Sequence, residues 1–254
     1  MAQPRIMRHP LAMPDSSIRR FGVARVLSKQ GVASRTQAAA WVREGRVRVN
    51  GRLVHDPEFG VLFGRDIVTV AGSEMQAAKP VYLMLNKPRG LVTSTSDEQG
   101  RDTVYRCFDG AGLPWISPVG RLDKASEGLL LFSNDTSWSA RITAPESRID
   151  KTYSVQIDRV ASSDDLTRMQ HGVDIDGERH AVKRASLLRS GGKNSWLEIV
   201  LDEGRNRQIR RILSSFDITV LRLIRVRIGA LELGDLAKGQ WRNLEANEVS
   251  TLSR

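Results

Sequence analysis

The chain has 254 residues, of which 40% are hydrophobic and 27% charged, a composition typical of a soluble globular protein with room for two domains. Its net charge of +10 indicates a polyanionic partner, and we expect nucleic acid rather than a membrane, because no amphipathic or lipidation signal stands out. No apolar run approaches the roughly 18 residues of a membrane span. A single cysteine excludes a disulfide framework and a thiolate metal cluster, and the four scattered histidines lack ligand spacing, so we expect no metal.

The positive charge is concentrated at the start of the chain. Residues 1–80 carry 13 Lys/Arg and 6 Asp/Glu, a net charge of +7, whereas the remainder carries 26 and 23. The first 14 residues lack the apolar segment of a secretory signal, so we expect a cytoplasmic protein in which residues 1–18 are disordered. This asymmetry suggests a basic binding domain followed by a domain that carries the chemistry.

The first informative block, residues 19–52, predicts two short helices and a hairpin. The first helix ends at Gly31. The second begins at Ser34 with a capping-box pattern and ends at Gly45. An alternating stretch then leads into Asn-Gly at residues 50–51, a strong hairpin signal.

This block carries nine Lys/Arg and one acid, Glu44, so ion pairing within it cannot neutralise its surface. Such a bias favours a polyanion-binding face over an ordinary solvated one. The region from Phe21 to Val70, which includes most of this block, resembles the S-four-type RNA-binding domain. The resemblance rests on Leu27-Ser28-Lys29, residues 31–35, Gly45-Arg46-Val47 and Val49-Asn50-Gly51. The resemblance implies that this domain grips structured RNA, and we assign the contacts to Arg20, Lys29, Arg35, Arg46 and Arg48.

A small, polar stretch at residues 71–80 predicts a linker between a first domain at 19–70 and a second at 81–254. The second domain is dominated by strand patterns and hairpin turns, with few helices. The strand patterns lie at residues 81–85, 129–132, 151–157, 196–201 and 218–224. We therefore expect an α+β protein with a small N-terminal α/β domain and a larger domain built on a mostly antiparallel mixed sheet.

One stretch of the second domain points to chemistry. Gly120-Arg121-Leu122-Asp123 lies shortly before the apolar pattern at 129–132. An acid beside a guanidinium at the mouth of a buried strand is held on rigid structure, so Asp123 is our candidate catalytic residue. No glycine-rich nucleotide motif is present, which excludes ATP-driven and dinucleotide chemistry.

These residues resemble the signature of the pseudouridine synthases. The Lys87-Pro88-x-Gly90 turn, Lys151-x-Tyr153, residues 203–211 and residues 221–229 match the same family in the same order. With the first domain, the resemblance extends over about residues 20–245 and indicates the branch that modifies ribosomal RNA. It implies the pseudouridine synthase fold and the isomerisation of uridine to pseudouridine. This exchange is intramolecular, so we expect no cofactor.

The resemblance also implies roles for individual residues. Asp123 is the catalytic carboxylate, and its action as a nucleophile on the sugar, as a nucleophile on the base or as a general base is left open. Arg210 is the cation beside it, Tyr153 stacks on a flipped uracil, and Leu223 lies against the base. Arg121 fills the gap left by the flipped base or orients the loop.

One position departs from the family pattern. The family usually has a threonine-serine pair before the glycine, where this chain has Ser126-Glu127. The family's loop contacts to RNA therefore do not carry over directly to this chain, and the effect of Glu127 on substrate choice is left open.

The expected partner is structured ribosomal RNA of either subunit, including pre-ribosomal particles, and we expect a monomer that does not bind membranes. Two rival functions are a non-catalytic RNA-binding or ribosome-assembly protein and a glycosidase-like hydrolase. The hydrolase needs a second acid, for which Glu127 and Asp135 are the candidates.

Overall fold

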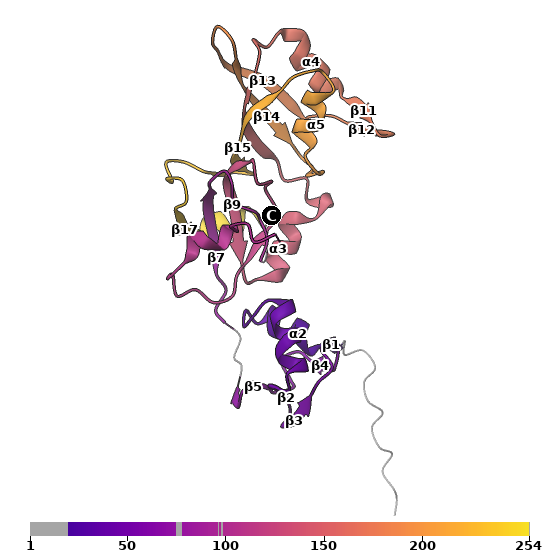
Figure 1. Ribbon diagram of the computed structural model, residues 1–254, viewed down its shortest axis with the longest axis vertical. Helices are drawn as coiled ribbons and strands as arrows, with labels where there is room; N and C mark the ends of the chain where they lie inside the picture. The colour runs from indigo at the N-terminus through magenta and orange to yellow at the C-terminus, as the bar shows by residue number, and fades with distance from the viewer. Residues whose placement is uncertain (1–19, 75–77, 96, 98, 254) are drawn as a thin grey trace, which may run out of the picture. The chain divides into compact units, whose positions relative to one another are not determined.

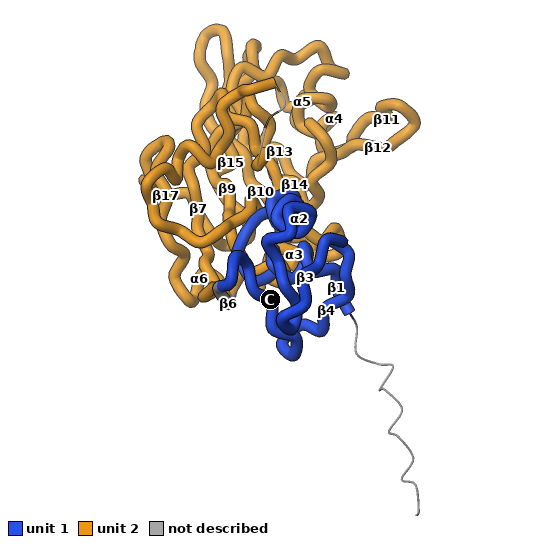
Figure 2. Tube along the Cα trace, turned by 60° about the horizontal axis from the view of Figure 1, so that its bottom comes forward, with its two compact units in different colours: residues 1–76 blue, residues 77–254 orange. Residues whose placement is uncertain are grey.

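The structure is a computed structural model that describes residues 20–74, 78–95, 97 and 99–253. The chain divides into two compact units, residues 1–76 and 77–254 (Figure 2). The expectation of disorder for residues 1–18 lies outside the described residues. Within the described residues, no helix is long and apolar enough to cross a membrane.

The first unit is a small α/β domain with the two helices and the hairpin that the sequence predicts (Figure 1). Ser34 Oγ accepts a hydrogen bond from Gln37 N at 3.0 Å, which confirms the helix start. Val47 and Val49 are buried while Arg48 is exposed, as the alternation requires. The elements are β1 (Arg20–Gly22), α1 (Val23–Lys29), α2 (Arg35–Arg43), β2 (Val47–Val49), β3 (Arg52–Val54), β4 (Gly60–Leu62), β5 (Val68–Val70) and β6 (Ser73–Glu74).

Two residues of the expected 71–80 linker form a strand instead. β6 pairs antiparallel with β5, so the small sheet has the order β3-β2-β5-β6. An edge strand of two residues is held by backbone hydrogen bonds, and its composition carries no alternating pattern that would reveal it.

The second unit is built on one large mixed sheet, which confirms the expected fold class. Its strand order is β13-β14-β10-β15-β9-β7-β17, with β16 beside β15 and β8 beside β9. Among the pairs of named strands in this sheet, only β9 with β15 is parallel.

The second unit contains strands and helices whose bounds are as follows. The strands are β7 (Tyr82–Lys87), β8 (Ser117–Val119), β9 (Glu127–Ser133), β10 (Lys151–Ile157), β11 (Val173–Ile175), β12 (Glu178–His180), β13 (Arg184–Ser190), β14 (Ser195–Leu201), β15 (Val220–Ile228), β16 (Leu231–Glu232) and β17 (Trp241–Asn243). The α-helices are α3 (Thr136–Thr143), α4 (Ser163–His171), α5 (Gln208–Ser214) and α6 (Ala246–Thr251), and the 3₁₀ turns are η1 (Val104–Phe108) and η2 (Pro145–Ser147).

Strand β9 is buried along its whole length because both faces of the sheet are covered there. Leu130 and Phe132 pack into one core cluster, which includes residues of α4 and α5. Leu129 and Leu131 pack into a second cluster with Trp138 of α3. An unbroken apolar run is the pattern expected for a strand covered on both faces, and the prediction for residues 129–132 is confirmed.

The parallel contact between β9 and β15 depends on Gly128. Its φ is +98°, a left-handed conformation that side chains disfavour. A Cβ atom at this position would lie 2.3 Å from the carbonyl oxygen of Arg225 on β15. Glycine is therefore required for the two strands to approach where the loop that carries Asp123 enters the sheet.

We predict that Gly128→Ala lowers the free energy of unfolding by about 3 kcal/mol or more, because the new Cβ clashes with rigid backbone as well as straining φ. Urea denaturation measures the loss. Gly177→Ala is the matched control, since Gly177 also has a left-handed φ, +78°, but has open space around it. The control should lose only about 1 kcal/mol. Equal losses in the two variants would contradict the close-approach explanation.

Candidate active site

Asp123 lies in the loop between β8 and β9, at the mouth of the buried strand, as the sequence predicts. Its side chain is 33% exposed, and it lines a cavity of about 550 Å³. The cavity walls come from distant segments, namely residues 119–123 and 126, residues 142–145, β10, Leu201 with residues 203–209, and β15. The sheet thus brings together segments about 100 residues apart in the sequence.

The loop that carries Asp123 is fixed through its backbone. Five consecutive carbonyl groups, at residues 122–126, accept hydrogen bonds from outside the loop. The donors are Thr93 Oγ1 to Leu122 O at 2.7 Å, Lys87 Nζ to Asp123 O at 3.2 Å and to Ser126 O at 2.9 Å, Gly90 N to Lys124 O at 2.8 Å, and Arg210 Nη2 to Ala125 O at 3.3 Å. Such a loop holds its side chains in a fixed geometry, as catalysis requires.

Lys87 is the central donor beneath this loop. It is fully buried, and besides the two loop carbonyls it donates to Pro88 O at 3.1 Å. Burial lowers the pKa of Lys87 to about 8, against the opposing effect of the Asp123 charge. The Lys87-Pro88-x-Gly90 turn was recognisable in the sequence but this role was not, because the acceptors lie 36 and 39 positions further along the chain.

The cation that approaches the Asp123 carboxylate is not the expected one. Arg207 Nη1 lies 3.8 Å from Asp123 Oδ2. Arg210 instead donates to the carbonyl oxygens of Ala125 and Val220. Burial lowers the pKa of Arg210, as does the nearby charge of Arg207, while Asp123 opposes both. Arg210 therefore supports the loop backbone, and Arg207 approaches the carboxylate.

Arg207 begins α5 from a left-handed backbone conformation, with φ +50° and ψ +28°. This conformation is uncommon for a residue other than glycine and often marks a functional position. It places the guanidinium in the cavity wall rather than along the helix surface. The signal in the sequence was its place within the matched segment 203–211, which did not distinguish it from Arg210.

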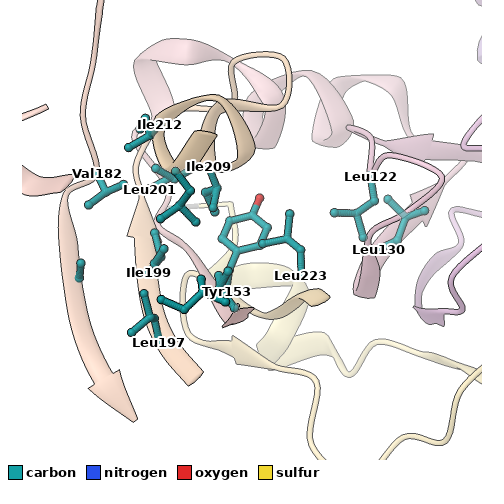
Figure 3. Packing of buried hydrophobic residues seen from close by; sticks show 14 of the residues in the cluster. Leu122, Leu130, Tyr153, Val182, Leu197, Ile199, Leu201, Ile209, Ile212 and Leu223 are labelled. Atoms are coloured by element: carbon teal, nitrogen blue, oxygen red, sulfur yellow. The ribbon is translucent and has the colours of Figure 1, made fainter. Parts of the chain in front are cut away.

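Tyr153 and Leu223 line the same cavity as Asp123 and Arg121. Tyr153 lies on β10 and Leu223 on β15, and both belong to the main core cluster, with 8% and 6% exposure. Figure 3 shows the Tyr153 ring between Leu223 and Ile209 of α5. The apolar wall of the cavity is thus the exposed margin of the core, which suits a planar apolar group.

The cavity is strongly cationic. Its lining includes five basic side chains, Arg121, Lys151, Arg205, Arg207 and Arg225, and two acids, Asp123 and Glu203. Burial and the neighbouring Arg225 lower the pKa of Lys151. Such a lining suits a polyanionic substrate. No cluster of three or more His, Cys, Asp or Glu side chains able to hold a metal ion occurs in the described part of the chain.

The two acids considered as partners for Asp123 both bind other groups of the protein. Glu127 is buried against Arg222 and Lys238. Asp135 caps α3 and accepts a hydrogen bond from Tyr82 Oη at 2.9 Å. Neither lines the cavity, so the acid pair of a glycosidase is not formed by these residues. The Glu127 side chain points into the protein, so it offers no surface of its own to RNA.

The basic residues assigned to RNA binding in the first unit divide into two groups. Arg35 is paired with Glu58 at 3.2 Å and Arg46 with Glu44 at 3.5 Å, so the counter-charge at Arg35 comes from outside residues 19–52. The remaining three make no ion pair within the described residues: Arg20 and Arg48 donate to Gly60 O and Gly51 O, and Lys29 lies 4.5 Å from the Phe21 ring centroid.

Comparisons with known proteins agree with this architecture. The family model described as RNA pseudouridylate synthase matches residues 81–215, and the S4 domain model matches residues 22–67. The chain is 35% identical to ribosomal large subunit pseudouridine synthase B of Bacillus subtilis over 90% of this chain and 93% of that protein.

Two further proteins are similar along most of the chain. The protein of the same name from Pseudomonas aeruginosa is 34% identical over 90% of this chain and 61% of its own length. A solved structure described as a pseudouridylate synthase is 29% identical, with a TM-score of 0.63 over 91% of this chain and 99% of that one.

The buried amine of Lys87 predicts a pH dependence of stability. Because its pKa is about 8 in the folded protein, below the ordinary value of 10.5 that we take for the unfolded chain, the unfolded chain binds more protons between these values. The free energy of unfolding of the wild type should therefore rise relative to Lys87→Met by about 1.4 kcal/mol per pH unit from pH 8 towards pH 10. Urea denaturation of both proteins across this range measures it. Parallel curves would contradict the perturbed lysine.

Proposed function

The chain belongs to the RNA pseudouridylate synthase family, and on this premise we propose that it converts one or more uridines of ribosomal RNA into pseudouridine. The observation that carries the proposal is the Asp123 carboxylate, held on a backbone-fixed loop in a cationic cavity beside Tyr153 and Leu223. The relatives named as large-subunit synthases favour large-subunit RNA as the substrate.

The reaction breaks the bond between ribose C1′ and uracil N1 and forms one between C1′ and C5. The C5 proton leaves and N1 gains a proton, so the exchange balances without a co-reactant. Asp123 supplies the one carboxylate that this chemistry needs, as a nucleophile towards C1′ or the base or as a proton acceptor. Arg207 places a positive charge 3.8 Å from this carboxylate.

The target nucleotide must leave its stack to enter the cavity, which costs a few kcal/mol. Stacking on an aromatic ring returns about 1–3 kcal/mol. We assign this role to Tyr153, with Leu223 against the base, because both present apolar surface beside Asp123. Arg121 lies on the same loop and is assigned to occupy the gap in the RNA or to orient the loop.

The first unit is proposed to anchor structured RNA. Its match to the S4 domain supports this role, as do Arg20, Lys29 and Arg48, which make no ion pair within the described residues. We further propose that the protein acts as a monomer in the cytoplasm and accepts pre-ribosomal particles. Sedimentation and activity on assembly intermediates test the oligomeric state and the choice of particle.

We expect Asp123→Asn to abolish pseudouridine formation in ribosomal RNA while RNA affinity stays within about twofold, since the substitution keeps the shape of the side chain. Turnover is measured by mapping pseudouridine, and affinity by filter binding. Asp109→Asn, at an exposed turn outside the cavity, is the control and should be fully active. Unchanged turnover in Asp123→Asn would refute the catalytic assignment. RNA binding by a wild type without turnover would favour the non-catalytic rival.

The salt dependence of RNA binding tests the anchor. Each lost phosphate contact lowers the slope of log K against log salt by about 0.7–0.9. Arg48→Gln should therefore reduce the slope by about one, and Arg20→Gln should do the same. The control is Arg106→Gln, because Arg106 is already neutralised by Asp102 in the second unit. If Arg48→Gln leaves the slope unaltered, this surface does not bind the RNA backbone.

A further inference from the structure

Glu127 is a buried acid that the reaction does not use. It is the first residue of β9 and lies four positions after Asp123, and only 2% of it is exposed. It does not line the cavity. Burying a carboxylate costs free energy unless it is paired with opposite charge. We therefore expect Glu127, at the end of the Asp123 loop, to have specific cationic partners.

Two cations from distant segments hold the Glu127 carboxylate. Arg222 of β15 binds it with both ends of its guanidinium, at 3.0 Å from Nε to Oε1 and 2.9 Å from Nη2 to Oε2. Lys238 Nζ lies 2.6 Å from Oε2. Burial acts to raise the pKa of Glu127, but these two partners outweigh it and the pKa is lowered. The group is therefore an anion at neutral pH.

The Lys238 segment is tied back to β7 beneath the same loop. Asn86 Nδ2 donates to Leu236 O at 2.7 Å, and Gly239 N donates to Asn86 O at 2.8 Å. The next residue, Lys87, donates to the loop carbonyls of Asp123 and Ser126. Contacts thus run from β7 to the loop, through Glu127 to Lys238, and back to β7.

Arg222 connects the loop to the strand that carries the apolar wall. It is the immediate neighbour of Leu223 on β15, and Glu127 lies opposite Ile224 in the parallel pairing of β9 and β15. Since successive residues of a strand face opposite sides, Arg222 and Leu223 project from opposite faces of the sheet. The ion pair thus joins the end of the catalytic loop to the strand that presents Leu223 to the cavity.

We propose that Glu127 is a positioning residue: through Arg222 and Lys238 it sets where the Asp123 loop stands relative to Leu223, without touching the RNA. This inference rests on the proposed function, because its readout is pseudouridine formation. It explains why an acid occupies this position in a strand otherwise dominated by apolar side chains. A displacement of about 1 Å in catalytic geometry is sufficient to lower a rate by roughly 100-fold.

The test compares Glu127→Gln with Glu232→Gln in the full chain. Glu127→Gln keeps the size of the side chain and should lower kcat by about 10–100-fold with KM and RNA affinity within about twofold. Glu232 of β16 forms an exposed ion pair at 2.7 Å with Arg227 of β15, the strand that also carries Arg222. Glu232→Gln should retain wild-type kcat. A folded Glu127→Gln variant with wild-type kcat, or one that loses only RNA affinity, would overturn the proposal.

Three further variants keep the test decisive if Glu127→Gln fails to fold. The Lys238 side chain is 58% exposed, so Lys238→Met removes its ion pair with Glu127 with little disturbance of the core. This variant should lower kcat several-fold at unchanged KM. Arg222→Lys should recover part of the rate lost in Arg222→Gln, because it retains the charge. Wild-type kcat in all three would overturn the positioning role. An inactive wild type would instead refute the proposed function.

Discussion

Hydrogen bonds to five consecutive carbonyl groups, at residues 122–126, hold the loop that carries Asp123. A loop pressed against a fully buried strand cannot leave its carbonyls unpaired, because water does not reach them freely. Lys87 satisfies two of them since an ammonium group offers three donors and needs no acceptor. The burial of its charge is tolerated because the carbonyls converge on it. The position of Asp123 follows from the backbone, and its side chain remains available to a substrate.

The second constraint is the single parallel contact among the named strands of the large sheet. Where β9 begins, Gly128 allows the backbone of β15 to approach at a distance that no Cβ would permit. The same junction joins the loop that carries Asp123 to the strand that carries Leu223 and Arg225. The cavity is therefore formed along the contact between the two antiparallel halves of the sheet. Its cationic lining and its apolar wall come from segments that this contact brings together.

Most local elements were predictable from the residues. The strand through Leu129–Phe132 followed from an unbroken apolar run, the helix at Ser34 from its cap, and the hairpin at residues 50–51 from its turn residues. Asp123 was identified as the candidate carboxylate because several spaced motifs occur in one order, and the family match supports that interpretation. Patterns of this kind depend on neighbours within a few positions, so they can be read from one chain.

Contacts between distant segments were not predictable in the same way. Arg207 rather than Arg210 approaches Asp123 because α5 begins from a left-handed residue, which no periodicity reveals. Glu127 resembled a surface change in an RNA-binding loop, yet its partners lie 95 and 111 positions away and draw it into the interior. Composition and periodicity therefore indicated the fold class, and the resemblance of the spaced motifs to a known family indicated the candidate acid. The assignment of each charge to a partner arose only on folding, because a charged side chain binds whichever opposite charge the sheet brings within reach.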